Sequence, residues 1–314
     1  SLAPPRDLAG PSSLRVPLTW QPGAAAGPGG QNKESIIAAG EKRGGLDLVV
    51  TSHHGHARQL AREALREEYD VVVAAGGDGT VHDVINGLLA DGKPRSKFGL
   101  IPIGSGNDFA YAMGISTDIS EAVETIYRNR GRFIDLASVE DDRGVKQLFA
   151  NNLGIGFDAN VVIRVESISR LRGFPKYFWG VLKTLVLDFH PFRFDMRFDD
   201  ENLIEDVLLI AFGIGPRHGG GFKLTPEALN DDDKIDTCTV RPMRRWQALR
   251  FLNSAVQGTH LQNPLVTMRQ SREIEIRCND PLPIHIDGEV FSFPKDNVRR
   301  LRITSLPNAV EVLV

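Results

Sequence analysis

The sequence predicts two domains, an open parallel α/β sheet followed by a domain built mainly from antiparallel strands. Three observations support this fold class. The chain has 314 residues, a length that suits two domains. Between residues 46 and 130, short β-branched runs alternate with amphipathic stretches, which is typical of a parallel sheet covered by helices. Beyond residue 131, strand-like runs follow one another closely and several alternate apolar and polar residues, so we place the domain boundary at residue 132.

The composition narrows the class of protein. Hydrophobic residues make up 41% and charged residues 25% of the chain, which is ordinary for a globular protein. The formal net charge of -3 does not favour nucleic-acid binding. Two cysteines, Cys238 and Cys278, cannot build a disulfide framework, and no apolar run reaches the length of about 18 residues that a membrane span needs. Without a basic start followed by an apolar stretch, we expect a cytoplasmic protein with no signal peptide.

The N-terminal domain, residues 1–132, is expected to be irregular over residues 1–30, which are rich in proline and glycine. The candidate strand at residues 14–20 is expected to be an edge strand or no strand, because Pro17 has no N–H to donate. The expected strands are residues 46–51, 70–75 and 98–103, and the expected helices are residues 56–67, 81–89 and segments up to 130.

The C-terminal domain, residues 133–300, is expected to be rich in strands, and residues 301–314 are expected to pack back on the N-terminal domain. The expected strands are residues 133–139, 147–154, 193–198, 207–213, 235–241, 272–277 and 283–286. The expected helices are residues 158–183 and 245–257.

The strongest motif is Gly76-Gly77-Asp78-Gly79-Thr80, which follows an expected buried strand and precedes an expected helix. Glycine lets a phosphate chain approach the backbone closely, and the free N–H groups at a helix N-terminus attract an anion. Thr80 is a candidate cap for the helix, and Asp78 is a candidate group for organising Mg²⁺ beside the phosphates. The alternative is a tight turn without a ligand.

A second glycine loop, Gly104-Ser105-Gly106-Asn107-Asp108, lies between the next expected strand and helix. Parallel strands end at one edge of their sheet, so we expect this loop to form one wall of a nucleotide cleft. The alternative is a second turn with Asn107 or Asp108 as the helix cap.

Two later motifs carry acidic residues. In residues 284–290 (IHIDGEV), Asp287-Gly288 predicts a hairpin turn, and a tip that faced the cleft would let Glu289 accept a proton from an attacking hydroxyl. Residues 226–234 (PEALNDDDK) predict either a solvated turn or a loop that holds a hard cation through oxygen ligands. Residues 154–159 (GIGFDA) imitate a dinucleotide fingerprint but lack the acid that should close a second strand.

Together, GGDGT, GSGNDFA, NNLGIGFDA, GGGF followed by PEA, and the late DGE resemble the diacylglycerol kinase catalytic family, which includes sphingosine kinases and bacterial lipid kinases. GGDGT also occurs in NAD kinases, whereas GSGNDFA and DGE favour the lipid kinases. The resemblance implies an N-terminal domain of NAD kinase/phosphofructokinase-like type and a C-terminal antiparallel β-sandwich that binds the lipid. It also implies transfer of the γ-phosphate of ATP to a lipid hydroxyl.

The resemblance implies roles for individual residues. Glu289 resembles the general base, and Asp78, Asp108 and Asp135 resemble the acidic network around the catalytic Mg²⁺. The expected ATP contacts are Thr51, Gly76, Gly77, Asp78, Gly79, Thr80, Val81, His82, Ser105, Gly106 and Asn107. The expected ligands of a structural cation are the Asp232 carboxylate and the backbone carbonyls of Leu229 and Lys234.

The sequence departs from the family pattern at two places. The family usually opens with a strand that ends in N-P-x-x-G, whereas the nearest sequence here, residues 21–27 (QPGAAAG), matches this pattern poorly and lies in the region expected to be irregular. The acidic loop has Asp233 where the family has glycine, so Asp233 is expected to need a positive φ.

Basic and aromatic side chains lie among one another over residues 164–183, which suits peripheral contact with an anionic inner membrane face. They are Arg164, Arg170, Arg172, Lys176, Tyr177, Phe178, Trp179 and Lys183. The alternative is a helix packed on the β domain with solvated basic side chains. Two other functions stay open, an NAD kinase-like nucleotide kinase and a catalytically degenerate regulator that binds lipid or nucleotide. The identity of the lipid also stays open, and a homodimer is compatible with the sequence.

Overall fold

The computed structural model describes residues 14–18, 28–42, 47–92, 94–166 and 173–314. These residues form two compact units. The first unit contains the described residues up to Gly104, together with Met113–Phe133 and Val310–Val314. The second unit contains Ser105–Ala112 and Ile134–Ala309. The units interleave along the chain, whereas the domains expected from the sequence are continuous stretches.

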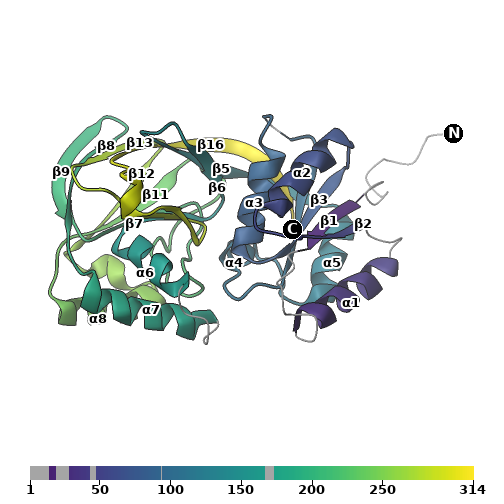
Figure 1. The fold of residues 1–314 in the computed structure, drawn as a ribbon, viewed down its shortest axis with the longest axis horizontal. Coiled ribbons are helices and arrows are strands. Elements are labelled where there is room, and N and C mark those ends of the chain that lie inside the picture. Colours follow the sequence, from purple (N-terminus) through teal and green to yellow (C-terminus); the bar gives the residue numbers. More distant parts are fainter. Residues whose placement is uncertain (1–13, 19–27, 43–46, 93, 167–172) are drawn as a thin grey trace. The chain divides into compact units, whose positions relative to one another are not determined.

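The first unit is built on a parallel sheet with the strand order β2-β1-β3-β4, and the end of β16 lies beside β4 (Figure 1). Its strands are β1 (Leu14–Leu18), β2 (Asp47–Val50), β3 (Val71–Gly76) and β4 (Lys97–Pro102). Its helices are α1 (Pro28–Glu41), α2 (His56–Arg66), α3 (Asp78–Leu88) and α5 (Ile119–Arg128). Figure 1 shows α2 and α3 on one side of this sheet and α1 and α5 on the other.

Strand β3 explains why both faces of this sheet need helices. Residues 71–75 are five apolar residues without surface exposure, so side chains on both faces of the strand are covered. Val71, Val73 and Ala75 pack with Ile126 of α5 and Leu313 of β16. The carboxyl end of β3 then leads directly into the first glycine loop.

The sequence-based prediction for Pro17 is wrong. Strand β1 lies inside the sheet, where it pairs with β2 on one side and β3 on the other. Pairing with β3 includes Arg15 and Leu18 but skips Val16 and Pro17, so the ladder to β3 is interrupted at the residue that lacks an N–H. The prediction of an irregular start is also wrong for β1 and for the beginning of α1 at Pro28.

The second unit is the antiparallel sandwich that the sequence and the family resemblance predict. One sheet has the order β12-β11-β10-β7-β14-β15, and the other contains β16-β13-β8-β9 with β5 and β6 attached. The first of these sheets comprises β7 (Asn152–Gly156), β10 (Leu209–Gly213), β11 (Ile235–Val240), β12 (Val266–Ser271), β14 (Ile284–Ile286) and β15 (Glu289–Ser292). The other comprises β5 (Gly131–Asp141), β6 (Lys146–Phe149), β8 (Phe192–Phe198), β9 (Glu201–Val207), β13 (Glu273–Cys278) and β16 (Arg300–Leu313).

The core of the second unit lies between its two sheets. In β8, residues alternate between buried and exposed, so Phe194 and Met196 face inward and meet Leu153 and Phe212 of the other sheet. Helices α6 (Phe157–Glu166), α7 (Gly173–Leu187) and α8 (Arg245–Gln257) cover the remaining face of the six-stranded sheet. A short helix, α4 (Asp108–Met113), begins in the second unit. Among the described residues, no helix is both long and apolar enough to cross a bilayer.

Two expected elements are each divided in the structure. The run expected at residues 147–154 forms β6 and β7, with Ala150 and Asn151 between them. The N–H groups of these two residues bind a side chain instead of continuing a strand ladder. The helix expected at residues 158–183 is α6 and α7, and residues 167–172 lie outside the described part of the chain.

Candidate functional site

The first glycine loop begins where β3 ends, and Gly77 is the N-cap of α3. The N–H groups of Thr80 and Val81 both donate to the Gly77 carbonyl, at 3.0 and 3.1 Å. A Cβ atom on Gly77 would stand only 3.0 Å from the Cα of Gly104, so the backbone of this loop packs directly on the start of the second loop. The proposed cap is therefore wrong, because Thr80 lies inside the first turn of α3 rather than before it.

The other predicted nucleotide contacts of the first unit are Thr51, directly after β2, and Val81 and His82 on α3. Thr51 is buried directly after β2, and Gly55 is the N-cap of α2. His82 is buried on α3, where its Nε2 lies 3.4 Å from Nη2 of Arg58 on α2. The structure thus places His82 in the packing between two helices, and its contact with a nucleotide stays a prediction.

The second glycine loop, from Ser105 onward, belongs to the second unit. Asp108 is 3% exposed, and its Oδ2 accepts the N–H of Gly220 at 2.8 Å, while its Oδ1 lies 3.1 Å from Nε of Arg217. Burial raises the pKa of the Asp108 carboxyl, and the Gly220 N–H and the Arg217 charge oppose this rise. Nη2 of Arg217 also donates to the Gly106 carbonyl, at 3.3 Å. The loop is therefore fastened to the segment that contains Arg217 and Gly220, which sequence reasoning did not include in the site.

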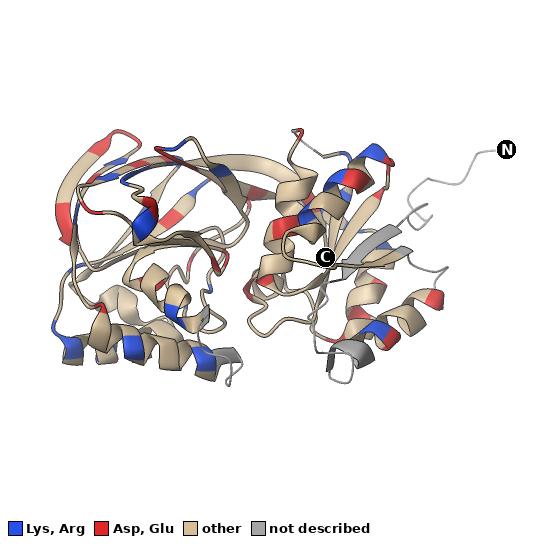
Figure 2. Ribbon diagram, viewed as in Figure 1, with Lys and Arg blue, Asp and Glu red and all other residues tan. Residues whose placement is uncertain are grey.

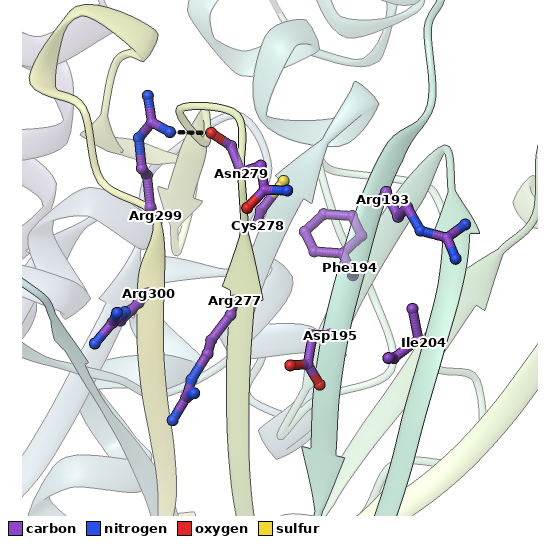
Figure 3. Close-up of a pocket in the computed structure, with 9 residues that line it drawn as sticks. All are labelled: Arg193, Phe194, Asp195, Ile204, Arg277, Cys278, Asn279, Arg299 and Arg300. Atoms are coloured by element: carbon purple, nitrogen blue, oxygen red, sulfur yellow. Dashed lines mark hydrogen bonds between the residues drawn. The ribbon is translucent and has the colours of Figure 1, made fainter.

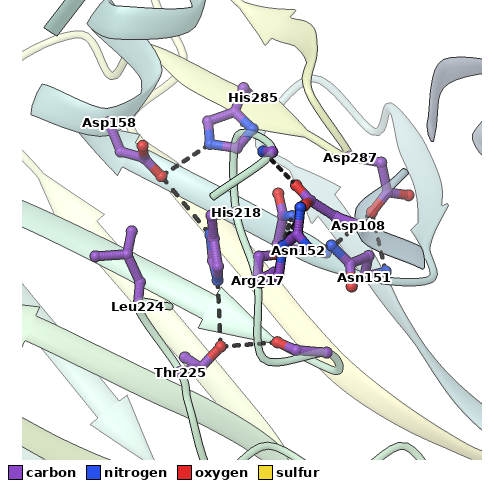
Figure 4. Close-up of polar contacts among 12 residues, drawn as sticks. Asp108, Asn151, Asn152, Asp158, Arg217, His218, Leu224, Thr225, His285 and Asp287 are labelled. Carbon is purple, nitrogen blue, oxygen red and sulfur yellow. Dashed lines mark hydrogen bonds and ion pairs between the residues drawn. The ribbon is translucent and has the colours of Figure 1, made fainter. Parts of the chain in front are cut away.

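The hairpin that carries Glu289 is anchored by the residue two positions earlier. The Asp287 carboxylate accepts three backbone N–H groups, from Ala150 at 3.1 Å, Asn151 at 3.0 Å and Asn152 at 2.9 Å. Figure 4 shows Asp287 beside Asn151 and Asn152. Asp287 is 5% exposed and has a φ of 49°, as the turn between β14 and β15 requires. Glu289, half-buried, is the first residue of β15. The sequence predicts the turn, but the anchoring carboxylate of Asp287 was missed.

Asp135 lies beside the acidic loop. Its Oδ2 accepts the N–H of Asp233 at 2.6 Å, and its Oδ1 accepts the N–H of Asn308 at 2.8 Å. Asp233 has a φ of 59°, so the positive value that the sequence predicts for this residue is confirmed. Asp135 thus holds the acidic loop against β16, and a role for it near Mg²⁺ stays a prediction.

Asp236, on β11 just after the acidic loop, is a carboxyl group whose unusual surroundings the sequence did not reveal. Burial is the largest cause that raises the pKa of Asp236 to about 6, and the negative charges of Asp232 and Glu227 add to it. Asp232 accepts the N–H of Lys234 at 3.1 Å. Within the described part of the chain, no three His, Cys, Asp or Glu side chains are arranged to hold a metal ion. The expected cation set of Asp232 with the Leu229 and Lys234 carbonyls has only one such side chain and stays a prediction.

A buried cluster of two histidines and an aspartate was also missed. Nε2 of His285 lies 2.9 Å from Oδ2 of Asp158, and Nδ1 of His218 lies 4.0 Å from the same oxygen (Figure 4). A Cβ atom on Gly154 would stand 2.3 Å from both Asp158 Oδ2 and His285 Nε2, so this glycine of the GIGFDA segment makes room for the cluster. The only clue in the sequence is that glycine, because the three side chains come from distant segments.

His218 is uncharged in this cluster. The Thr225 hydroxyl donates to the Gly215 carbonyl at 2.8 Å, so at 3.2 Å it accepts the Nε2–H of His218. Burial lowers the pKa of His218 to about 4, against the attraction of Asp158. The neutral tautomer with its proton on Nε2 satisfies both observations.

This low pKa predicts how stability depends on pH. The unfolded chain takes up a proton on His218 below its ordinary pKa of 6.5, while the folded chain does not until about pH 4. Stability should therefore fall as the pH drops through this window, and His218 should account for about 2 kcal/mol between pH 7 and pH 5. Urea unfolding at both pH values, with wild type and His218→Gln, measures this contribution. Asp236 acts with the opposite sign in both proteins, so an equal pH dependence of the two would contradict the prediction.

A separate pocket of about 390 Å³ lies on β8, β9, β13 and β16 and contains none of the predicted site residues (Figure 3). Its walls include four arginines and Asp195. Arg193 already pairs with Asp206 at 3.2 Å, and Arg299 donates to the side chain of Asn297 at 3.1 Å. One of the four arginines is therefore neutralised by an ion pair, and a second is held by a neutral amide.

Comparison with known proteins agrees with these motifs. Residues 20–139 match the family described as "Diacylglycerol kinase catalytic domain", and residues 151–314 match the "YegS C-terminal NAD kinase beta sandwich-like domain". A probable lipid kinase YegS-like of Stenotrophomonas maltophilia is 32% identical over 293 residues, which cover 90% of this chain and 91% of that protein. The diacylglycerol kinase of Bacillus subtilis is 28% identical over 243 residues, which cover 76% of this chain and 78% of that protein.

Solved structures show the same fold at low sequence identity. A crystal structure of a diacylglycerol kinase from Bacillus anthracis is 20% identical and has a TM-score of 0.69, covering 96% of this chain and 97% of that one. An NAD kinase from Archaeoglobus fulgidus, solved in complex with ATP, is 12% identical and has a TM-score of 0.52, covering 96% of this chain and 93% of that one. With both parts matched to family descriptions and a relative above 30% identity across nearly its whole length, the chain belongs to the diacylglycerol kinase family of kinases, together with the YegS-like lipid kinases.

Proposed function

We propose that this kinase transfers the γ-phosphoryl group of ATP to the hydroxyl of a lipid, most simply diacylglycerol, and gives a phosphatidate-type product. The observation that carries the proposal is the first glycine loop. There, a buried strand ends at Gly76 and leads through Gly77 into the N-terminus of α3, and neither glycine adds a side chain of its own. Such a loop suits the triphosphate of a nucleotide because the helix end presents N–H groups and a positive dipole to it.

The proposed partners of these residues are ATP and Mg²⁺. In this proposal, residues 76–82 and Thr51 receive the nucleotide in the first unit, and Ser105, Gly106 and Asn107 contribute from the second loop. Asp78 at the start of α3 is the acid assigned to Mg²⁺, which when bound neutralises charge on the phosphates. Asp108 and Asp135 accept backbone N–H groups that hold their loops in place.

Glu289 is the proposed general base. It stands at the first position of β15, where the hairpin anchored by Asp287 fixes its backbone. A carboxylate there would accept the proton of the lipid hydroxyl as the oxygen attacks phosphorus. No covalent enzyme intermediate is needed, because phosphoryl transfer depends mainly on positioning and on charge stabilisation.

The test is the transfer of label from [γ-³²P]ATP. Wild type and Asp78→Asn are incubated with Mg²⁺ and either diacylglycerol, phosphatidylglycerol or sphingosine in detergent micelles, or with NAD. We expect label in a lipid with wild type and little with the variant. Label only in NAD would support a nucleotide kinase, and no consumption of ATP with any acceptor would support a regulator without activity; either result would overturn the proposal.

Helices α7 and α8 provide a surface for a lipid substrate. Neither helix contains an acidic residue, and Figure 2 shows Lys and Arg along both. Phe178 and Trp179 on α7 are 44% and 48% exposed, and Trp246 on α8 is 50% exposed. Arg164 pairs with Asp188 and is not part of this surface, while Arg170 and Arg172 lie outside the described residues. The combination suits an anionic membrane surface.

We therefore expect salt-sensitive binding to anionic vesicles. Charge reversal of Lys176 and Lys183 together should weaken sedimentation with phosphatidylglycerol-containing vesicles by at least about tenfold at low salt, since each basic residue near such a surface contributes about 1 kcal/mol. Lys146→Glu, on β6, is the matched control and should bind as wild type does. Equal binding to neutral phosphatidylcholine vesicles at all salt concentrations would contradict this expectation.

A further inference from the structure

Arg217 lies between two parts of the second unit that the proposed reaction needs. Its guanidinium faces the second glycine loop, where Nε is 3.1 Å from Asp108 Oδ1 and Nη2 is 3.3 Å from the Gly106 carbonyl. The ring of Tyr111 lies beneath it, 4.3 Å from Cζ. The Arg217 side chain is 19% exposed and that of Asp108 is 5% exposed, so the pair is largely removed from water.

The backbone of the same residue leads to the hairpin of Glu289. The Arg217 carbonyl accepts the side-chain amides of Asn151 at 2.8 Å and Asn152 at 3.2 Å. The backbone N–H groups of these two asparagines donate to Oδ1 of Asp287. Figure 4 shows this series of contacts from Asp108 to Asp287. Gly288 and Glu289 follow directly in the sequence.

A second contact brings the same two regions together. The Gly220 N–H donates to Asp108 at 2.8 Å. The ring of Tyr177 lies against Gly219, and its hydroxyl lies 3.4 Å from the place of a Cβ atom on Gly288. The segment around Arg217 therefore touches the glycine loop directly and reaches the hairpin through Tyr177, and every contact in this series lies inside the second unit.

We propose that Arg217 is a positioning residue for phosphoryl transfer, which fixes the second glycine loop relative to the hairpin that carries Glu289. The proposal rests on the function proposed above. A planar guanidinium with several donors can hold a carboxylate and a carbonyl together, whereas the single ammonium group of lysine has no such fork. A shift of about 1 Å in such an arrangement can cost on the order of 10² in rate.

The removal of Arg217 also has an electrostatic consequence that is independent of activity. Asp108 is buried, and without the opposing arginine its carboxylate would remain charged in the interior with the Gly220 N–H as a backbone donor. An uncompensated buried charge is strongly destabilising, and protonation relieves it. The destabilisation by Arg217→Met should therefore be smaller at pH 5 than at pH 8. It should lose this pH dependence when Asp108 is also changed to asparagine.

The experiment compares wild type, Arg217→Met, Arg217→Lys, Asp108→Asn and the double variant Arg217→Met/Asp108→Asn. For activity, we expect kcat to fall about 100-fold in Arg217→Met with a smaller rise in the KM for ATP, and about 10-fold in Arg217→Lys. The double variant should lose much less than the product of the single losses, because the two residues act as a pair. Kinetic constants within about twofold of wild type in Arg217→Met would overturn the proposal, and so would losses that multiply.

Urea unfolding midpoints of the same proteins between pH 5 and pH 8 provide the second measurement. Arg197→Met is the matched control, because Arg197 forms a partly exposed pair with Glu275 and should show no comparable pH trend. If wild type labels no lipid, the proposed function fails, and the unfolding data still decide whether Arg217 compensates Asp108. A destabilisation by Arg217→Met that is equal at pH 5 and pH 8 would overturn that part of the argument.

Discussion

Glu289→Gln is expected to lower kcat by about 10²–10⁴-fold, the usual range for loss of a general base. Glutamine keeps the size of the side chain but cannot take the proton of the lipid hydroxyl. The backbone of the hairpin is fixed by Asp287, so the substitution should leave the fold and the ATP site intact. The KM for ATP should therefore stay within about twofold of wild type. Initial rates at saturating lipid with varied ATP measure both constants.

Glu275→Gln is the matched control for this substitution. Glu275 lies on β13, where it pairs with Arg197 on the neighbouring strand. The substitution makes the same chemical change outside the proposed site, so the kcat of the Glu275→Gln variant should equal that of wild type. A Glu289→Gln protein that retained near-normal kcat would remove Glu289 from the mechanism.

Asp287→Ala is expected to lower the free energy of unfolding by about 3–5 kcal/mol and to abolish activity in the assay. Three backbone N–H groups, those of Ala150, Asn151 and Asn152, would lose their acceptor inside the protein. Alanine would also have to adopt a φ of 49°, which aspartate and asparagine tolerate better. Urea unfolding monitored by tryptophan fluorescence measures the loss.

Asp287→Asn distinguishes two effects on stability, because asparagine tolerates the turn conformation but keeps only part of the carboxylate's hydrogen bonding. Its amide oxygen can still accept from Asn151 and Asn152, while its NH₂ group would face the N–H of Ala150. We expect a loss of about 1–3 kcal/mol, clearly smaller than for alanine. If Asp287→Ala unfolded at the same urea concentration as wild type, the carboxylate would not anchor the hairpin.

Local sequence patterns predict the parts of the candidate site that are local in structure. The first glycine loop is recognisable because a run of valine and alanine in β3, the glycines and the start of α3 are consecutive in the sequence. The turn at Asp287 is recognisable for the same reason. The partners of these motifs are not predictable in this way. Arg217 is more than 100 residues from Asp108, and Asp158 is 127 residues from His285.

The difference between local patterns and distant partners also explains why the sequence did not predict strands β9 and β16 as they occur. Strand β9 has the sequence ENLIEDV, with exposed acidic residues at an outer position of its sheet, so its composition favours a loop. Strand β16 contains Pro307 and Asn308, which has a φ of 50°, in its middle. Such residues usually end a strand, and β16 is continuous because it pairs with β13, with β4 and with β5.

Strand β16 also has a consequence for biosynthesis. Val312 pairs with Phe98 at the open side of β4, and Leu313 completes the apolar core around Ile126. A ribosome makes these residues after every residue of the second unit. The first unit therefore cannot complete its sheet until translation has passed the whole sandwich. Until then, the side of β4 that pairs with β16 has no partner strand in this sheet. The final folding step of the first unit is delayed until residues 310–314 have been made, although most of its residues emerge first.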